Sequence, residues 1–174
     1  LARRPVGKTS KVQDPPKEKL QSLIYLYSQG KLAAVIEQAK ALTKQYPEAF
    51  TVWNLIGASA AQIGQLDQAI FAFKRVLAIK PNYAEAYNNM GNALQEQGKL
   101  EEAIEAYNKA LAIKPDYAEA CYNMGNALQG QGKLEEAIEA YNKTLAIKPD
   151  YAEAYNNMGN VLKDQGKLEE AIEA

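Results

Sequence analysis

The sequence has no histidine and only one cysteine, Cys121, among its 174 residues. A chain without histidine lacks Ser–His and Cys–His nucleophile pairs, histidine zinc ligands and histidine proton shuttles. A lone cysteine cannot form an internal disulfide, which is compatible with a reducing compartment, and we expect a cytoplasmic location. Paired carboxylates, glycine-rich phosphate loops and clustered metal ligands do not stand out either. We therefore predict a chain that is not an enzyme and needs no metal or cofactor.

The chain also has almost no net charge. Lys and Arg together number 20 and Asp and Glu together number 21, which gives −1 at pH 7. Domains that bind nucleic acid usually carry a basic excess, so we expect no nucleic-acid partner. No apolar run approaches the roughly 18 residues that a membrane-spanning helix needs, and no signal-peptide pattern opens the chain. We therefore expect no membrane association.

What the sequence does contain is a repeat of 34 residues. The segment AEAYNNMGNALQEQGKLEEAIEAYNKALAIKPDY recurs immediately downstream with four substitutions, two of which place Cys121 and Tyr122 where the first copy has Tyr87 and Asn88. More divergent copies precede it. The predicted organisation is a basic linker or disordered arm at 1–15, a degenerate first unit at 16–49, full units at 50–83, 84–117 and 118–151, and a truncated unit at 152–174.

Each unit is predicted to form two helices. Asp116 and Glu119 have the spacing of a capping box at the start of the first helix, and equivalent pairs recur one unit earlier and one unit later. Gly98 suits the left-handed residue that ends a helix. Pro115 prevents the second helix from continuing. The unit is therefore a helical hairpin.

Two positions in the unit predict close packing. Gly91 is small because the two helices of a hairpin approach closely there, and Tyr107 is large because it fills the space between neighbouring units. One hairpin cannot bury both of its faces, so its stability must come from stacking on its neighbours. We predict an all-α, right-handed superhelical solenoid of stacked antiparallel helix pairs, with the first helices on its concave side. An antiparallel bundle is the alternative, and the fixed period disfavours it.

This unit resembles the tetratricopeptide repeat family over roughly residues 16–174. The residues that carry the resemblance are Tyr87, Met90, Gly91, Leu94, Ala103, Tyr107, Ala110 and Pro115. The preceding unit repeats the pattern with Trp53, Gly57, Ala69, Phe73 and Pro81. The first unit departs from it, because Leu23 stands at the glycine position and Ala39 at the aromatic position, which indicates an N-terminal cap or a distorted repeat. The resemblance implies a non-catalytic protein–protein interaction module.

Two rows of asparagine run along the predicted concave face. They consist of Asn89, Asn123 and Asn157 in one row and Asn92, Asn126 and Asn160 in the other. An amide side chain both donates and accepts hydrogen bonds, so the rows match the backbone of an extended peptide of any sequence. They are similar to the asparagine ladders of the tetratricopeptide superhelix in O-GlcNAc transferases, which implies contact with a substrate backbone. The alternative is that duplicated repeats copied these residues without a binding role.

Other side chains refine the expected ligand. Tyr122 and Leu55 flank the rows and are candidate anchors, although simple repeat drift also explains Tyr122. Chaperone-binding members of the family hold a C-terminal carboxylate with Lys and Arg, where this chain has Glu153 and Asn157. An acidic stripe repels a terminal carboxylate, so we do not expect that mode. The same stripe, which includes Glu119, either attracts a basic peptide or only caps the helices.

Three functions follow from these observations. We predict first that the chain binds an extended peptide or partner segment on its concave, asparagine-rich face. The second hypothesis is a substrate-targeting region of a larger transferase, such as a glycosyltransferase, whose catalytic domain lies outside this chain. The third is a scaffold that self-associates head to tail, because the truncated last unit leaves an apolar face near Leu162, Leu168 and Ile172 uncovered. For the third we expect a head-to-tail contact or fraying of residues 167–174.

Overall fold

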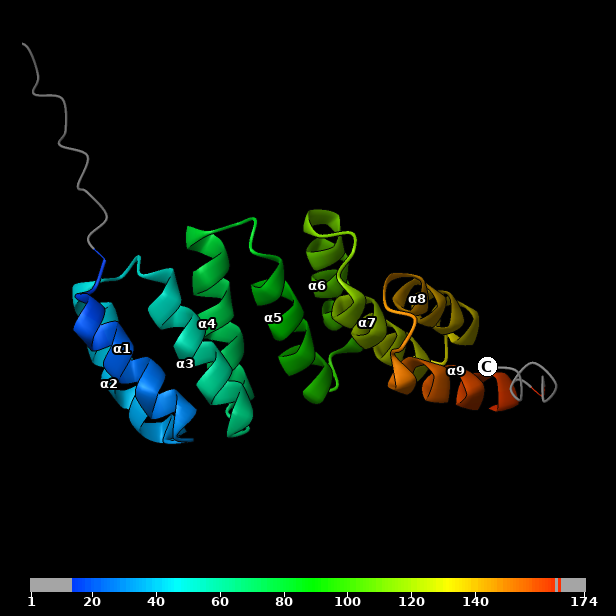
Figure 1. The fold of residues 1–174 in the computed structure, drawn as a ribbon, viewed down its shortest axis with the longest axis horizontal. Helices are drawn as coiled ribbons and strands as arrows, with labels where there is room; N and C mark the ends of the chain where they lie inside the picture. The colour runs from blue at the N-terminus through cyan, green and yellow to red at the C-terminus, as the bar shows by residue number, and fades with distance from the viewer. Residues whose placement is uncertain (1–13, 165, 167–174) are drawn as a thin grey trace, which may run out of the picture.

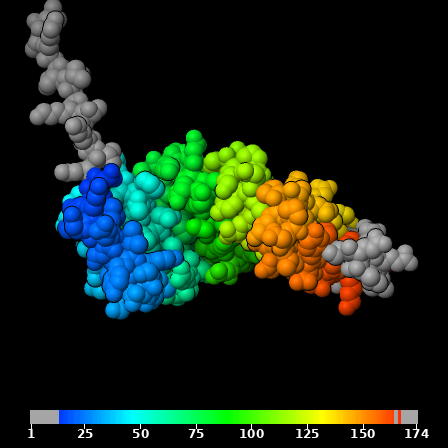
Figure 2. Space-filling view, in the orientation of Figure 1, coloured from blue at the N-terminus to red at the C-terminus, as the bar shows by residue number. Residues whose placement is uncertain are grey.

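The computed structural model describes residues 14–164 and 166, and within them every regular element is an α-helix. The helices are α1 (Lys17–Ser28), α2 (Leu32–Gln45), α3 (Phe50–Gln62), α4 (Leu66–Ile79), α5 (Ala84–Glu96), α6 (Leu100–Ile113), α7 (Ala118–Gly130), α8 (Leu134–Ile147) and α9 (Ala152–Asp164). Figure 1 shows them as one row of helix pairs in chain order. The space-filling view in Figure 2 shows that the row forms one continuous, elongated body.

Contacts between helices show which side of the row is the inner one. Each helix packs against the next along the chain, and each odd-numbered helix also contacts the next odd-numbered helix. Across the described part of the chain, no even-numbered helix contacts another even-numbered helix. The odd-numbered helices therefore lie on the concave side and the even-numbered helices on the convex side. The predicted all-α solenoid of stacked antiparallel helix pairs is confirmed.

Gly98 ends the first helix of its unit as predicted. Its φ of +74° lies in the left-handed region that favours glycine. The N–H of Gly98 donates to the carbonyl of Gln95 at 2.8 Å, and the N–H of Lys99 donates to the carbonyl of Leu94 at 2.9 Å. These bonds satisfy carbonyls at the end of α5 and turn the chain toward α6.

The predicted capping boxes at the starts of α5 and α7 are wrong. The N-cap residues are Tyr83 and Tyr117, and neither helix has a side-chain capping hydrogen bond. Asp116 lies one residue before the N-cap, where its carboxylate is not placed to accept from the first turn. Glu119, the expected partner of that box, instead accepts a hydrogen bond from Asn88 of the preceding unit at 3.3 Å.

The predicted close approach at Gly91 is confirmed. A Cβ atom added there would lie 2.5 Å from Cε1 of Tyr107, whose side chain is fully buried. Gly57 faces Phe73 and Gly125 faces Tyr141 in the same way, each at 2.6 Å. The glycine on the first helix thus makes room for the ring on the second helix of the same unit.

The first unit reverses this arrangement of sizes. Leu23 on α1 replaces the glycine, and Ala39 on α2 replaces the aromatic ring. Both side chains are buried, and they belong to one core cluster. The large side chain has moved from the second helix to the first, so the departure from the family pattern preserves tight packing.

Candidate functional site

The asparagine rows lie on α5, α7 and α9, where they link successive units. Asn123 Nδ2 donates to Asn88 Oδ1 at 3.1 Å and to Asn92 Oδ1 at 3.0 Å. One unit later, Asn157 Nδ2 donates to Asn126 Oδ1 at 2.8 Å and to the Tyr122 hydroxyl at 3.0 Å. The amides expected to face a ligand therefore also hold neighbouring first helices together.

Buried tyrosines of the second helices reach the same amides. The Tyr107 hydroxyl lies 2.8 Å from Asn92 Oδ1 and 2.9 Å from Gln95 Oε1, and it donates its single proton to one of them. The Tyr141 hydroxyl lies 2.8 Å from Asn126 Oδ1 in the next unit. Burial raises the pKa of Tyr141 to about 12, and burial followed by the charge of Glu119 raises the pKa of Tyr107. Both hydroxyls therefore stay protonated at neutral pH.

We predict that these raised pKa values make the protein lose stability as the pH rises above about 10. In the unfolded chain both phenols titrate near 10.0, so at higher pH the unfolded state loses protons that the folded state keeps. The contribution of the two protonated phenols to stability is complete at pH values below their pKa in the unfolded chain. It disappears as the pH rises through their pKa in the folded protein. Urea unfolding at several pH values between neutral and about 12 measures it. Wild type is expected to lose more stability than Tyr107→Phe/Tyr141→Phe, and equal losses would contradict the prediction.

Some donors and acceptors of the ladder asparagines have no partner within the described part of the chain. An amide has two N–H donors and an oxygen with two lone pairs. The Oδ1 atoms of Asn92 and Asn126 each lie within hydrogen-bond distance of two donors, the next asparagine amide and a tyrosine hydroxyl, and their Nδ2 groups make no hydrogen bond to another described residue. Asn123 and Asn157 use both N–H groups, and their Oδ1 atoms accept from no described residue. The concave face thus presents donors from one row and acceptors from the other, each held in a fixed orientation.

The network stops at the junction between α3 and α5. Ala58 stands where Asn92 and Asn126 stand in later units, so it offers no acceptor to Asn89. Asn89 makes no hydrogen bond to another described residue, and neither does Asn160, which is exposed. Asn54 Oδ1, at the position of Asn88, is buried without a partner. Asn89 therefore keeps its complete amide for other partners.

Two adjoining hollows lie along these amides. The first, of about 280 Å³, is lined by Tyr27, Ala58, Ala61, Gln62, Phe73, Asn89, Asn92 and Glu96. The second, of about 330 Å³, is lined by Asn92, Gln95, Glu96 and Asn123. They share Asn92 and Glu96, so together they form one groove across α1, α3, α5 and α7, which we call the concave groove. Its charged lining residue is the acidic Glu96.

Tyr122 and Leu55 lie outside the lining of the concave groove. The Tyr122 ring stacks on Tyr151 with centroids 5.0 Å apart, and its hydroxyl accepts from Asn157. Leu55 packs against the core cluster of the first units. Their role as ligand anchors stays a prediction.

Asn88 is a site residue that the sequence did not reveal. Its side chain is fully buried, donates to Glu119 and accepts from Asn123. Its spacing from Glu119 and Asn123 along the chain becomes meaningful only once the units are stacked.

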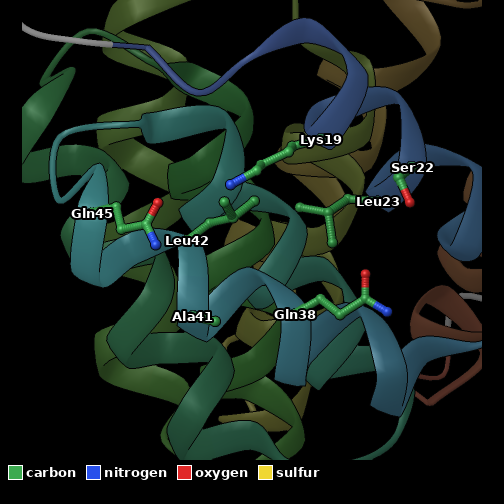
Figure 3. A pocket seen from close by; sticks show the side chains of 7 residues that line it. All are labelled: Lys19, Ser22, Leu23, Gln38, Ala41, Leu42 and Gln45. Atoms are coloured by element: carbon green, nitrogen blue, oxygen red, sulfur yellow. The ribbon is translucent and has the colours of Figure 1, made fainter.

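A separate hollow lies at the N-terminal end of the row, between α1 and α2. Its volume is about 310 Å³, and its lining consists of Lys19, Ser22, Leu23, Gln38, Ala41, Leu42 and Gln45. Figure 3 shows Leu23 and Leu42 next to each other with polar side chains around them. It contains none of the ladder amides, so it is not part of the concave groove.

Other expected features have different outcomes. Among residues 14–164 and 166, no group of three or more acidic, histidine or cysteine side chains is arranged to hold a metal ion. Within the same part of the chain, no helix has the length and apolar character to cross a membrane. Residues 1–13 of the predicted arm at 1–15 lie outside the described residues, as do Leu168 and Ile172, which were expected to be uncovered. Leu162, also expected on that uncovered face, is buried. Head-to-tail association therefore stays a prediction.

Stacked hairpins of constant period, with a polar ladder on the inner helices, define a helical-repeat solenoid. The sequence pattern of the family described as TPR repeat matches residues 57–98, 91–132 and 130–166, which is more than half of the chain. The chain belongs to the tetratricopeptide repeat family. The TPR fold is a protein-interaction fold and is generally not catalytic.

Several solved structures are similar to this chain. The crystal structure of MamA is 30% identical, with a TM-score of 0.82 over 86% of this chain and 87% of that chain. The first TPR of Spaghetti (RPAP3) bound to the HSP90 peptide SRMEEVD is 25% identical, with a TM-score of 0.66 over 67% and 93% of the two chains. YrrB, described as a TPR protein with an unusual peptide-binding site, shares the fold at 18% identity, with a TM-score of 0.77 over 91% and 82%. No curated protein sequence matches the chain.

Proposed function

We propose that this chain is a non-catalytic module whose concave groove binds an extended segment of a partner protein through the backbone of that segment. The observation that carries the proposal is the set of unpaired amide groups, which are donors on Asn92 and Asn126 and acceptors on Asn123 and Asn157. Backbone N–H and C=O groups of an extended chain have the complementary chemistry. The peptide bound to the RPAP3 repeat supports this use of the fold.

Hydrogen bonds to six asparagines provide only part of the affinity. Each contributes about 0.5–1.5 kcal/mol net, so six give about 3–9 kcal/mol before the ligand is ordered. A micromolar complex needs about 8 kcal/mol. The remainder must come from side chains, and the hollow beside Ala58 offers Tyr27 and Phe73 for apolar contact. Since Glu96 is the charged residue of the lining, we propose a neutral or basic segment.

A test must separate binding from stability, because alanine at Asn123 removes links between units. The variant Asn92→Asp/Asn126→Asp achieves this. Each aspartate keeps oxygens that accept from the buried tyrosine and from the next asparagine, but it loses the Nδ2 donor that faces the ligand. We expect a loss of only a few tenths of a kcal/mol of stability, from the like charge of Glu96 four residues after position 92, and at least about tenfold weaker binding. The probe is a neutral, C-terminally amidated peptide selected from a random library on wild type, and calorimetry measures its affinity.

The matched control is Asn82→Asp/Asn142→Asp. It makes the same change in charge at two exposed positions outside the concave groove, and it should bind the peptide as wild type does. Equal affinity of both double variants would overturn backbone recognition by the ladder. Weaker binding by Asn82→Asp/Asn142→Asp would assign the effect to net charge instead.

A further inference from the structure

A second groove opens on the convex side, between α6 and α8. Its volume is about 560 Å³, and its lining includes Leu111, Pro115, Cys121, Met124, Lys143 and Ile147. The groove exists because α6 and α8 do not contact each other, so α7 between them forms the floor. We call this hollow the Cys121 groove.

The floor of this groove differs from the equivalent positions in the other units. Cys121 stands where the chain has Trp53, Tyr87 and Tyr155 in its other first helices. A cysteine side chain is much smaller than an aromatic ring, and Cys121 is only 2% exposed at the bottom of the groove. Burial raises the pKa of its thiol, and Lys143 offsets this in part, so at neutral pH the floor is uncharged. The groove therefore lacks an aromatic ring that the repeat normally provides.

Trp53 shows how such a ring is held. It lies on α3, between α2 and α4, in the position that corresponds to Cys121. Its indole Nε1 donates to the carbonyl of Pro47 at 2.8 Å, and the Arg75 guanidinium carbon lies 5.5 Å from the ring centroid. The ring thus has one acceptor at its edge and one cation at its face, and both interactions are favourable for an indole.

The Cys121 groove retains both partners without the ring. Pro115 corresponds to Pro47 and Lys143 corresponds to Arg75, each two repeat lengths later. Both residues line the groove, with Met124 beside Cys121 as an apolar and polarisable contact. The residues equivalent to the carbonyl and cation partners of Trp53 therefore both line a groove that has no aromatic side chain of its own.

We propose that the Cys121 groove binds a tryptophan side chain of a partner protein, with its ring over Cys121 and Met124 and its N–H donating to the Pro115 carbonyl. Lys143 lies against the ring face as Arg75 lies against Trp53. A phenylalanine fills the same space but has no donor for the carbonyl, so it binds more weakly. Because this groove is on the opposite side of the row from the concave groove, the two sites are occupied independently.

N-acetyl-tryptophanamide is the probe, titrated into the ¹⁵N-labelled full chain and followed by amide chemical shifts. Saturable shifts are expected for residues around the groove, including Cys121, Lys143 and Ile147. N-acetyl-phenylalaninamide is expected to bind about two- to tenfold more weakly, which is the value of one hydrogen bond. Equal affinity for the two probes, or no saturable shift at the groove, would overturn the proposal.

Two variants locate the site. Cys121→Trp supplies the missing ring from within and is expected to abolish the shifts while circular dichroism remains that of wild type. Lys143→Ala is expected to weaken binding about two- to fivefold. Its matched control, Lys109→Ala, removes the equivalent lysine of the preceding unit, where Tyr87 already occupies the floor, and should have no effect. If Cys121→Trp does not fold, equal affinities of the two lysine variants still refute the assignment.

Discussion

Replacing Gly91 by alanine is expected to lower the free energy of unfolding by about 1–3 kcal/mol, as overpacked cores do. The new Cβ would lie 2.5 Å from Tyr107 Cε1. The ring has no room to move, because it is fully buried and its hydroxyl is within hydrogen-bond distance of Asn92 and Gln95. This clash outweighs the roughly 1 kcal/mol that alanine gains over glycine in a helix. Urea unfolding followed by circular dichroism measures the difference.

Gly130→Ala is the matched control for this effect. Gly130 is the last residue of α7, and a Cβ there would meet only the side chain of Leu100, at 3.1 Å and 3.8 Å. Leu100 is half-buried and flexible enough to give way. We expect no loss of stability, or a gain of about 0.5 kcal/mol from the lower entropy of the unfolded chain. Equal losses of stability in Gly91→Ala and Gly130→Ala would show that the Tyr107 ring does not exclude a side chain at position 91.

The first unit suggests a rescue. Gly91→Leu/Tyr107→Ala reproduces the sizes found at Leu23 and Ala39. Tyr107→Ala alone is expected to cost about 3–5 kcal/mol through the cavity that it leaves. The double variant should lose less stability than the sum of the losses in Gly91→Leu and Tyr107→Ala, because the leucine fills part of that cavity. Strictly additive losses would contradict reciprocal packing between the two helices.

Asn123→Leu is expected to cost about 1–3 kcal/mol of stability, whereas Asn89→Leu should change it little. Both residues occupy the same position of their units. Asn123 donates to Asn88, which is fully buried, and its loss leaves Asn88 Oδ1 without a donor. Asn89 makes no hydrogen bond to another described residue, so leucine breaks none there. The pair therefore measures the stability that a ladder amide supplies, at matched shape and helix position.

Thermal unfolding of Asn89→Leu and Asn123→Leu gives the comparison directly. A similar midpoint for both variants would mean that the links at 3.0–3.1 Å contribute nothing to stacking. A larger loss in Asn123→Leu would show that one set of side chains both joins the units and faces the ligand. The affinities measured for variants of Asn123 or Asn157 would then have to be corrected for the loss of folded protein.

The sequence was enough to predict the repeat, the helix-ending role of Gly98 and the close approach of the two helices of a hairpin at Gly91. These features depend on contacts within one unit or on the backbone preference of one residue, so a single copy of the repeat contains the information. The same holds for the placement of Asn89 and Asn123 at the same position on the first helices of their units. Local periodicity therefore predicts the fold and the direction in which the candidate site faces.

The hydrogen bonds of the site depend on a different kind of information. Whether Asn123 reaches Asn88 and Asn92 is set by the rotation and rise between units, which spacing along the chain does not specify. The same relation gave Glu119 a partner in the preceding unit instead of a capping role. The Cys121 groove could not be predicted from the sequence either, because the space left by the smaller side chain depends on α6 and α8 standing apart.

Because the ladder is interrupted at Ala58, we expect the junctions between units to differ in stiffness. The junctions that contain Asn123 and Asn157 are joined on the inner side by amide hydrogen bonds. At the junction between α3 and α5 the inner side has a hollow and an unpaired Asn54 oxygen, and a Gln97–Asp67 hydrogen bond of 2.8 Å joins the two units elsewhere. Bending of the superhelix should then concentrate at the junction between α3 and α5, which is the least restrained one. Since the hollow beside Ala58 lies at this junction, we expect a ligand that tightens or straightens the superhelix to change the groove width chiefly at this point.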